Sequence, residues 1–420
     1  METEVYDGSG KLLSITDKNG FVTTLTYSTS NTPSSIAPTS GYLITVTDPA
    51  QRQLQFTYNA NGMLATVTDP AGQVYRYTID TNFNLASVLY PGTPTARNYL
   101  YNESAHTQGG AFPAALTGVV DENGARYGTF DYDTSGNAIA TQHAGGVDKF
   151  SLVYNSDGSS DVTDPQNSVT HHAFTIVNGV SLASTLSGPA IGFANVATRT
   201  YDSYNNPSST TDFNGVSTCY TYDQSHGLET SRVEGVTGGC SGTPVGLRTL
   251  QTDWDTALRE PIERRIYNAS GTLETKTHWV YNTRRQTTYR CIVDPAVSGA
   301  LSYTCGSSSN APTGVRQWAF TYCEQADVTA GTCPLVGLLK STDGPRTDVS
   351  DVTTYAYYQT TDLSGCATLG GTCHYLGDLK SITNALGQVT TYVSYDKDGR
   401  VTRVQDVNGV YTDMTYHARG

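Results

Sequence analysis

The side chains of this sequence best suited to chemistry are its eight cysteines, and all of them lie between residues 219 and 373. They fall into sequence-local pairs, and each pair brackets a Gly- and Ser-rich insertion. An even number of cysteines around loops is typical of disulfides in an exported protein. We therefore predict disulfides that join Cys219 to Cys240, Cys291 to Cys305, Cys323 to Cys333, and Cys366 to Cys373.

A zinc site is the alternative use of these cysteines. Zinc sites in small modules bring two cysteines together in Cys-x-x-Cys and add histidines at a fixed spacing. The sequence contains no Cys-x-x-Cys, and no histidine stands at finger spacing from a cysteine. Spacing alone does not prove the disulfide pairing, but it favours disulfides over metal.

Acidic turns of the form Asp-x-Asn-Gly resemble the opening of a calcium-binding loop. An EF-hand loop also requires an acidic ligand at its twelfth position. Counted from Asp17, that position is Ser28, which is not acidic; counted from Asp212 it is Asp223, but no flanking helices are predicted there. We therefore interpret these segments as turns and predict no metal site.

Two further groups could act as a nucleophile or a base. Cys240 stands in Gly-Gly-Cys-Ser-Gly, which resembles a nucleophile elbow, but that motif needs a helix after the turn. His171 and His172 could accept a proton, yet no nucleophile or carboxylate lies at a fixed spacing from them. We predict no catalytic residue and no cofactor, and we expect that the chain is not an enzyme.

A tryptophan between two acids is the remaining candidate for ligand contact. Glycosidases and sugar-binding surfaces use such groups, and here Trp254 lies between Asp253 and Asp255. On a strand, successive side chains point to opposite faces, so both acids would point away from the side of the ring. Sugar contact remains an open alternative, whereas the pattern does not support hydrolysis.

The elements that would position these side chains come from an internal repeat. The frame is Tyr-Asp/Asn-x-x-Gly-x-apolar-x-x-apolar-x-Asp-x-x-Gly, it recurs in about a dozen copies, and its period is about 20 to 22 residues where no insertion intervenes. Such a period is the scale of one supersecondary unit in a repeat protein. The residues that define the frame most clearly are Tyr58, Gly62, Asp69, Gly72, Tyr132, Gly136, Tyr222, Tyr395, Gly399, Asp406 and Gly409.

Each unit of the repeat predicts a β-hairpin and a connecting turn. The Asp or Asn side chain can bond its own backbone, and the Gly supplies a positive φ. About seven residues separate the turns, which is a normal strand length. Tyrosines two apart, such as Tyr75 and Tyr77, would share one face and form aromatic ladders across repeats. Leu64 and Val67 are three apart, so either a bulge intervenes or both faces carry apolar groups.

Composition and charge exclude some classes of partner. The net charge is −13, and only 15% of residues are charged, whereas phosphate binding needs clustered cations. The only basic doublets, at 264–265 and 284–285, stand within strand-like runs, where we expect solvated or edge positions. No apolar stretch reaches membrane-spanning length, and the first residues do not form a signal peptide. We therefore expect neither nucleic acid nor a membrane span.

The frame resembles the YD-repeat, or RHS-repeat, family over nearly the whole chain. Members include bacterial RHS polymorphic toxins, the C components of insecticidal toxin complexes, and animal teneurins. The resemblance implies a long β-sheet that spirals into a closed shell, which in the toxins holds a C-terminal toxic domain. Asp69–Gly72 matches the letters Asp-Pro-x-Gly of the family's cleavage signature but stands in an ordinary repeat turn. Self-cleavage and toxicity are therefore not expected of these residues.

We predict an all-β fold without significant helix: one continuous array of hairpins over residues 1–420 that forms an open, curved sheet or partial shell. Residues 1–218 are Cys-free repeats, 219–373 carry the Cys-bracketed insertions, and 374–420 are regular repeats that end in mid-repeat. Further insertions rich in Ser, Gly, Pro and Ala, which we expect to be loops outside the sheet, are Ser28–Ser40, Glu103–Ala114 and Ser181–Ala197.

The leading functional hypothesis is a structural one: a segment of a β-shell that encloses or displays another polypeptide. Its partners would be further repeats or a cargo domain of a longer protein, and its location the outside of a bacterial cell, secreted or at the surface. The alternative is an extracellular module whose exposed Tyr and Trp residues bind carbohydrate or a cell-surface partner.

Overall fold

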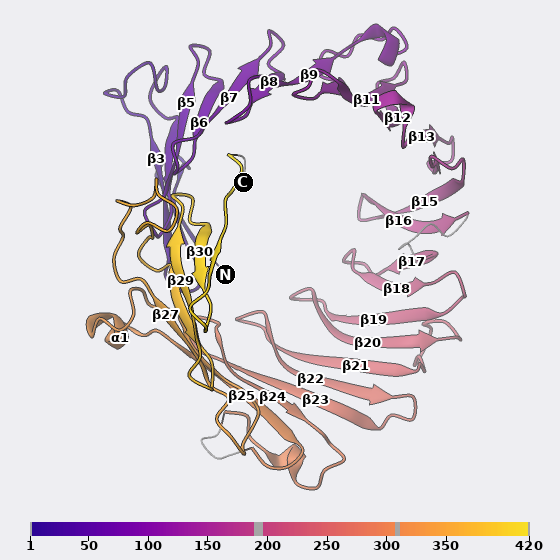
Figure 1. Ribbon diagram of the computed structural model, residues 1–420. Helices are drawn as coiled ribbons and strands as arrows, with labels where there is room; N and C mark the ends of the chain where they lie inside the picture. Colours follow the sequence, from indigo (N-terminus) through magenta and orange to yellow (C-terminus); the bar gives the residue numbers. More distant parts are fainter. Residues whose placement is uncertain (1, 189–195, 307–310, 419–420) are drawn as a thin grey trace.

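The computed structural model describes residues 2–188, 196–306 and 311–418. Over these residues the chain forms 31 β-strands, and each pairs antiparallel with the next strand along the sequence. The result is a single open meander that curves into a ring (Figure 1). The predicted all-β repeat sheet is thus confirmed, and helix is confined to one α-helical turn, α1 (Gln325–Thr329), and three short 3-10 segments among the described residues.

The strands and 3-10 segments have the following bounds: β1 (Thr3–Tyr6), β2 (Leu12–Thr16), β3 (Val22–Tyr27), β4 (Leu43–Thr47), β5 (Gln53–Tyr58), β6 (Leu64–Thr68), β7 (Val74–Ile79), β8 (Leu85–Leu89), β9 (Arg97–Tyr101), η1 (Ser104–His106), β10 (Leu116–Val120), β11 (Arg126–Tyr132), β12 (Ala138–His143), η2 (Ala144–Gly146), β13 (Phe150–Tyr154), β14 (Ser160–Thr163), β15 (Val169–Val177), β16 (Val180–Ser187), β17 (Thr198–Tyr201), β18 (Pro207–Thr211), β19 (Ser217–Asp223), β20 (Leu228–Val236), β21 (Arg248–Asp255), β22 (Glu260–Asn268), β23 (Leu273–Tyr281), β24 (Thr287–Val293), η3 (Ala300–Ser302), β25 (Val315–Tyr322), β26 (Leu339–Asp343), β27 (Thr353–Tyr357), β28 (Leu379–Thr383), β29 (Val389–Tyr395), β30 (Val401–Gln405) and β31 (Tyr411–Asp413).

The turns between strands are built by the Asp or Asn of the repeat. The Oδ1 atom of Asp121 accepts the backbone N–H groups of Asn123 and Ala125, both at 2.9 Å. The N–H of Asp121 donates to the carbonyl of Ala125, and Gly124 closes the turn with a φ of +80°. Glycine, which has no Cβ, tolerates that φ, whereas other residues are strained there. The same pattern at Asn59 and Asp406 confirms the turn chemistry predicted from the frame.

A β-bulge accompanies the repeat tyrosine. Tyr58 pairs with Leu64, whereas the preceding Thr57 pairs with Thr66, so the partner strand carries one extra residue. A bulge of this kind shifts the alternation of side chains by one and increases the local twist. It explains how Leu64 and Val67, three apart, face the same side. The same register shift recurs beside many other repeat tyrosines.

The sheet is a single layer with little core. Its accessible surface is 22957 Å² for 45.0 kDa, whereas a compact monomer of that mass exposes about 15,700 Å². One small apolar cluster lies where the insertion after β24 covers the sheet, and it contains Cys291, Val293, Ala300 and Val315. The repeat therefore supplies a wall, and only the insertions add a second layer to it.

The sheet coils until its last strands return to its first. Figure 1 places β29 and β30 beside the N-terminal strands, and the contacts agree. Arg52 Nη1 donates to the carbonyl of Asp398 at 3.3 Å, and the Asp398 carboxylate accepts the N–H of Ala71 at 3.1 Å. Nearby, Gly337 approaches Asn19 so closely that a Cβ on the glycine would stand 2.8 Å from the Asn19 Cβ. We call this set of contacts the coil contact.

The insertions differ from the sequence prediction in one place. Ser181–Ala197 was expected to be a loop, but the structure forms β16 over Val180–Ser187, in a hairpin with β15. The turn is Asn178-Gly179 with φ values of 49° and 78°, which is the pair favoured in tight hairpins. Residues 189–195 lie outside the described part of the chain. The prediction was wrong because it relied on the loop-like composition of the segment and overlooked the Asn-Gly pair that forms a hairpin turn just before it.

The basic doublets also differ from the prediction. Arg264 and Arg265 lie on β22, as predicted, but in the interior of the sheet, and Arg265 is paired with Asp253 and Glu263. Arg284 and Arg285 stand in the turn between β23 and β24, not in a strand. These arginines therefore hold neighbouring hairpins together instead of protecting an edge.

Candidate functional site: the two faces of the wall

The insertions identify which face of the sheet is outside. In Figure 1 the loops after β9 and β24 and helix α1 project outward from the ring. The loop after β9 contacts Asp131 through His106, and the loop after β24 contacts Gln317 through the N–H of Gly306. Because successive side chains alternate, Phe130 and its neighbours in the same row face inward.

The inward row is apolar and aromatic across the regular repeats. Direct cross-strand pairing carries it from β3 to β11, since paired residues share a face. The opposite, outward rows are mainly Thr, Ser, Gln and Asn. The inward residues are Leu25, Val46, Leu54, Phe56, Val67, Tyr75, Tyr77, Val88, Tyr99, Val119 and Phe130, and the charged Arg97, which pairs with Val88, interrupts the row.

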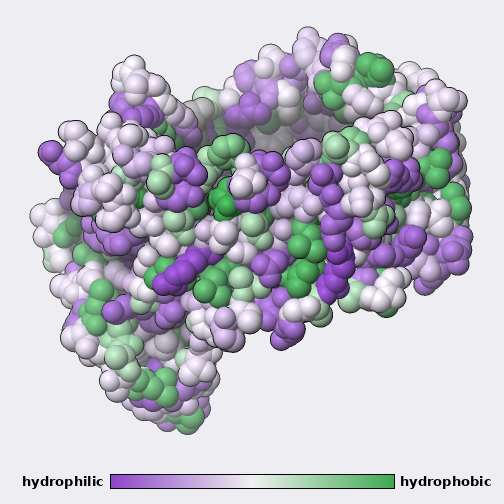
Figure 2. All heavy atoms as spheres, turned by 90° about the horizontal axis from the view of Figure 1, so that it is seen from above, coloured by the Kyte–Doolittle hydropathy of each residue, from purple (hydrophilic) through white to green (hydrophobic). Residues whose placement is uncertain are grey.

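The outside of the wall has no large apolar area on the face that Figure 2 presents. Hydrophobic residues there form small groups among hydrophilic ones, and the surface is hollowed toward the upper edge of the view. Scattered apolar residues of this kind are ordinary for a soluble surface. The two faces of the wall therefore differ in polarity because the inward rows are apolar and aromatic.

Tyrosine hydroxyls link successive repeats. Tyr58 Oη donates to the carbonyl of Leu43, and Tyr132 Oη to that of Leu116, at 2.7 and 2.9 Å. In both cases the acceptor is the first residue of the preceding strand, with which the tyrosine's own strand is paired. Further tyrosines in the same role are Tyr27, Tyr101, Tyr154, Tyr201, Tyr281, Tyr322, Tyr357, Tyr395 and Tyr416. We call these residues the tyrosine ladder.

The ladder differs from the expected rows of stacked rings. Ring contacts between tyrosines occur at separate places among the described residues, such as Tyr42 with Tyr58 at 4.7 Å and Tyr75 with Tyr90 at 6.1 Å. The hydroxyl-to-carbonyl bond is the feature that repeats. Burial raises the pKa of Tyr281 and of Tyr357 to about 12, so their hydroxyls keep the proton that they donate.

Arginines cover the aromatic rings of the longer strands. The guanidinium of Arg290 lies 5.1 Å from the ring of Trp318, and that of Arg264 lies 6.0 Å from the ring of Trp279. Cation–π contacts of this geometry are favourable. Trp254, between the two acids singled out in the sequence, donates its indole N–H to the carbonyl of Glu229 at 2.8 Å. These contacts reduce the aromatic surface that is free to stack on a sugar ring.

Histidine–carboxylate pairs occupy the outward face. His106 Nδ1 lies 2.7 Å from Asp131 Oδ1, and His171 Nδ1 lies 2.7 Å from Asp161 Oδ1. The contact with His171 lowers the pKa of the Asp161 carboxyl. A hollow of about 550 Å³ beside His106 is lined by Ser151 among others, but Ser151 stands two strands away from Asp131 in the same row. The first pair therefore fixes an insertion to the sheet, and the second links neighbouring strands.

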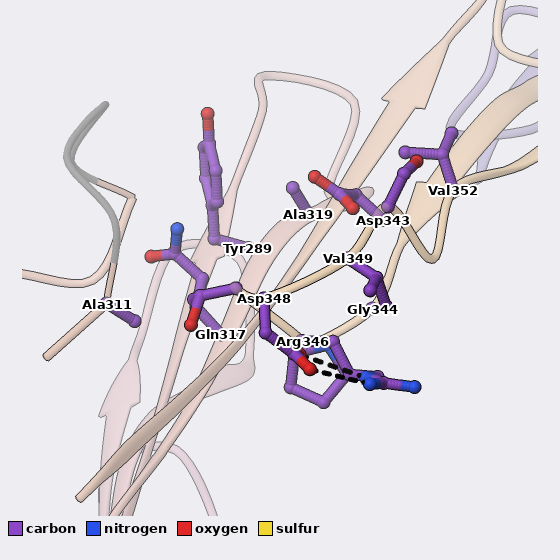
Figure 3. A pocket seen from close by; sticks show the side chains of 13 residues that line it. Tyr289, Ala311, Gln317, Ala319, Asp343, Gly344, Arg346, Asp348, Val349 and Val352 are labelled. Atoms are coloured by element: carbon purple, nitrogen blue, oxygen red, sulfur yellow. Dashed lines mark hydrogen bonds and ion pairs between the residues drawn. The ribbon is translucent and has the colours of Figure 1, made fainter. Parts of the chain in front are cut away.

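Figure 3 shows another surface hollow, of about 530 Å³, between β24, β25 and the loop 343–352. Arg346 and Asp348 form an ion pair at its rim, with their side chains more than half exposed. Burial and a hydrogen bond with Asp351 raise the pKa of the Asp343 carboxyl. Tyr289, Gln317 and Ala319 are among the other residues that line the hollow.

The cysteines form the four local pairs described above, Cys219–Cys240, Cys291–Cys305, Cys323–Cys333 and Cys366–Cys373. Cys240 is thus a disulfide partner and not a free nucleophile. Within residues 2–188, 196–306 and 311–418, no group of three or more His, Cys, Asp and Glu side chains is placed to hold a metal ion. No helix of the same ranges is long and apolar enough to span a membrane.

The repeat-defining residues stand at equivalent places in the wall. Tyr58, Tyr132, Tyr222 and Tyr395 each stand at a bulge. Gly62, Gly136 and Gly399 close the turns that follow three of them, Gly72 and Gly409 close the opposite turns, and all five have positive φ. The residues of the coil contact were missed by sequence reasoning. Arg52 and Asp398 are 346 positions apart, and nothing in either repeat distinguishes them.

Comparison with known proteins agrees with this geometry. The family model described as RHS Repeat matches residues 39–74, 58–95 and 375–411, which are regular hairpins of the wall. These segments of the chain are therefore RHS repeats. They are part of the continuous antiparallel β-wall. No curated protein matches the sequence.

Solved structures with a similar course include the TcdB2-TccC3-TEV crystal structure, with 12% identity, a TM-score of 0.36, and coverage of 96% of this chain and 26% of that one. The TcdB2-TccC3 crystal structure has 12% identity, a TM-score of 0.33, and coverage of 99% and 27%. A Photorhabdus luminescens Tc holotoxin pore with a TccC3 mutation has 10% identity, a TM-score of 0.31, and coverage of 96% and 27%. This chain therefore spans about a quarter of the length of each of these three structures.

Proposed function

We propose that this chain is a segment of the wall of a hollow β-shell that encloses another polypeptide, with a structural and not a catalytic role. The observation that carries the proposal is the coil contact. A single-layer sheet whose end contacts its own beginning surrounds a space, and the bond between Arg52 and Asp398 holds that arrangement. Such a wall separates its contents from solvent by steric exclusion alone.

The difference between the two faces supports enclosure. Inward residues such as Phe56 and Val67 are apolar, while the adjacent outward residues Gln55 and Thr66 are polar. Burying apolar surface contributes about 25 cal/mol per Å², so an enclosed polypeptide with apolar segments would be held by the inner face. The outer face, being polar, would remain in water.

The four disulfides support a location outside the cytoplasm. Disulfides persist in secreted and surface proteins and are rare where glutathione and thioredoxin keep thiols reduced. We propose that the shell is secreted or displayed at the cell surface, and that further repeats and the cargo belong to the same longer protein.

Protease protection in the full-length protein tests enclosure. We expect segments outside the repeats to resist a protease that digests the same segments when they are expressed alone. Val67→Asp places a charge on the inner face and should speed their digestion. Thr66→Asp, on the adjacent outward position, is the matched control and should leave the protection unchanged. Equal digestion of enclosed and isolated segments would overturn the proposal.

Carbohydrate binding is the weaker alternative. Guanidinium groups lie over the rings of Trp279 and Trp318, and the Trp254 indole N–H already has a backbone partner. A glycan array with the isolated chain separates the two hypotheses. Specific binding that is lost in Trp254→Ala would favour recognition over enclosure.

A further inference from the structure

The segment between β27 and β28, residues 358–378, crosses over β29 and is here called the strap. The N–H of Tyr395 on β29 donates to the carbonyl of Cys373 at 2.8 Å, and Ser394 Oγ donates to the carbonyl of Gly371 at 2.7 Å. Cys373 and Ser394 are 0% and 1% exposed. The strap and β29 therefore form one of the best-buried contacts of the described chain.

The strap also reaches the first coil of the sheet. Tyr375 is 5% exposed, and its hydroxyl donates to the carbonyl of Lys397 at 2.9 Å. Its ring lies 5.7 Å from the guanidinium of Arg52, the same guanidinium that bonds Asp398. Tyr375 thus stands between the hairpin tip of the last coil and the turn of the first, and its position depends on the strap.

A disulfide closes the strap just before Tyr375. Cys366 and Cys373 are seven residues apart, and the loop between them supplies the carbonyls of Gly371 and Cys373 that hold β29. Cys373 is buried, whereas Cys366 is partly exposed. A thiolate attacks one sulfur of a disulfide, so access to one cysteine is sufficient for exchange.

We propose that the Cys366–Cys373 disulfide is a redox latch for the coil contact, reduced by a dithiol. Two electrons and two protons pass from the dithiol to the cystine. The S–S bond breaks, two protein thiols form, and the dithiol becomes a disulfide. The freed loop no longer holds Tyr375 against Arg52, and the last coil separates from the first. The latch needs no cargo and so goes beyond the proposed function.

Hydrogen exchange of the isolated 420-residue chain tests the latch, with dithiothreitol as the probe. The N–H of Ala71 bonds Asp398 across the coil contact and reports its opening, and the N–H of Tyr395 reports the strap. We expect both amides to lose protection on reduction. The N–H of Gln73, which bonds Asp69 within its own turn, is the internal control and should not change.

Two variants separate this latch from general loosening of a reduced protein. The double variant Cys366→Ser, Cys373→Ser should show the unprotected state of Ala71 without reductant and no further change with it. The matched double variant Cys219→Ser, Cys240→Ser removes a disulfide from β19 and the insertion after β20, across the ring from β29 and β30 (Figure 1). It should behave like the unmodified chain.

The proposal is overturned if Ala71 keeps its protection in the Cys366→Ser, Cys373→Ser variant. It is also overturned if Ala71 keeps its protection in the fully reduced chain, with thiol titration as proof of reduction. Failure of the protease-protection experiment, by contrast, would contradict the proposed enclosure of a polypeptide and leave the proposed latch unaffected.

Discussion

Two stretches of the same sheet are built on different principles. Strands β4–β9 have five or six residues each and follow one another without large insertions. Strands β19–β25 have seven to nine residues and carry two insertions, after β20 and after β24, that are closed by disulfides. We call them the regular stretch and the insertion stretch.

The two stretches differ in how they are stabilised. In the regular stretch, Val88 and Pro91 are the only buried residues among those described, whereas the insertion stretch buries Leu228, Val236 and the cluster around Cys291. A one-layer sheet cannot bury both faces, so the regular stretch depends on hydrogen-bonded turns and on the tyrosine ladder. An insertion is thus what adds a buried core to this repeat.

The largest expected effect comes from removing a disulfide of the insertion stretch. Cys291→Ser with Cys305→Ser should lower the free energy of unfolding of that stretch by about 2–4 kcal/mol. All three tryptophans, Trp254, Trp279 and Trp318, lie in the insertion stretch. Urea unfolding followed by tryptophan fluorescence should therefore shift to lower urea.

The circular dichroism signal of the whole sheet provides the control for that experiment. Long repeat arrays need not unfold in one step, so its transition should broaden as the insertion stretch unfolds first. An unchanged fluorescence midpoint would mean that the disulfide adds nothing to the stability of the local core. The proposed difference in stabilisation between the two stretches would then be wrong.

The tyrosine ladder predicts a smaller effect that depends on burial. Tyr395→Phe leaves the carbonyl of Leu379 without its partner in a buried place, since Tyr395 is 5% exposed. The loss should be about 1–3 kcal/mol. Tyr154→Phe removes the equivalent bond at a ring that is 49% exposed, and water can replace it. Thermal unfolding should separate the two variants, and equal losses would contradict the role of burial.

The turn chemistry predicts a cost of about 1 kcal/mol or slightly more in a stretch without disulfides. Asp121→Ala removes the acceptor of two backbone N–H groups, and loss of comparable capping bonds costs about 0.5–2 kcal/mol. Asp121→Asn keeps an acceptor oxygen and should retain most of the stability. The check is urea unfolding by circular dichroism, and a full loss in the Asn variant would exclude the hydrogen bonds as the cause.

The smallest effect is a difference in pH dependence between the coil contact and the insertion after β9. Asp378, the last residue of the strap, accepts the N–H of Tyr375 at 2.7 Å and so lies beside the coil contact. Burial raises the pKa of the Asp378 carboxyl, so its charged form costs stability above that pKa, and the cost disappears as pH falls through it. Hydrogen bonds from Arg126 lower the pKa of Glu103, so its contribution is lost as pH falls below the usual value near 4.5. The two carboxyls act in opposite directions.

Asp378→Asn should therefore stabilise the coil contact at neutral pH, with a gain that vanishes toward pH 4. Glu103→Gln should instead destabilise the chain at neutral pH, with an effect that shrinks as pH falls below the usual value near 4.5. Hydrogen exchange of Ala71 and of the strands beside Glu103, measured from neutral pH to well below pH 4, tests both. If the stability effects of the two variants changed with pH in the same direction, the cause assigned to one of the two pKa shifts would be wrong.

The repeat frame was sufficient to predict most of the local structure. Asp-x-x-Gly fixes a turn through bonds between neighbours in sequence, and the spacing of turns fixes the strand length, as at Asp121 and Gly124. The local cysteine pairs follow from the same argument, because each brackets one insertion. The frame did not decide between a bulge and two apolar faces at Leu64 and Val67, since both agree with the same spacing.

What the sequence determined by itself is therefore the hairpin, repeated and paired with its neighbour, because every bond involved is between residues close along the chain. Only the tertiary structure decided how tightly the wall coils, which face is inward, and that Arg52 meets Tyr375 and Asp398. Those properties sum small twists over many strands. A small change in twist per strand leaves each hairpin intact but moves the two ends of the coil far apart.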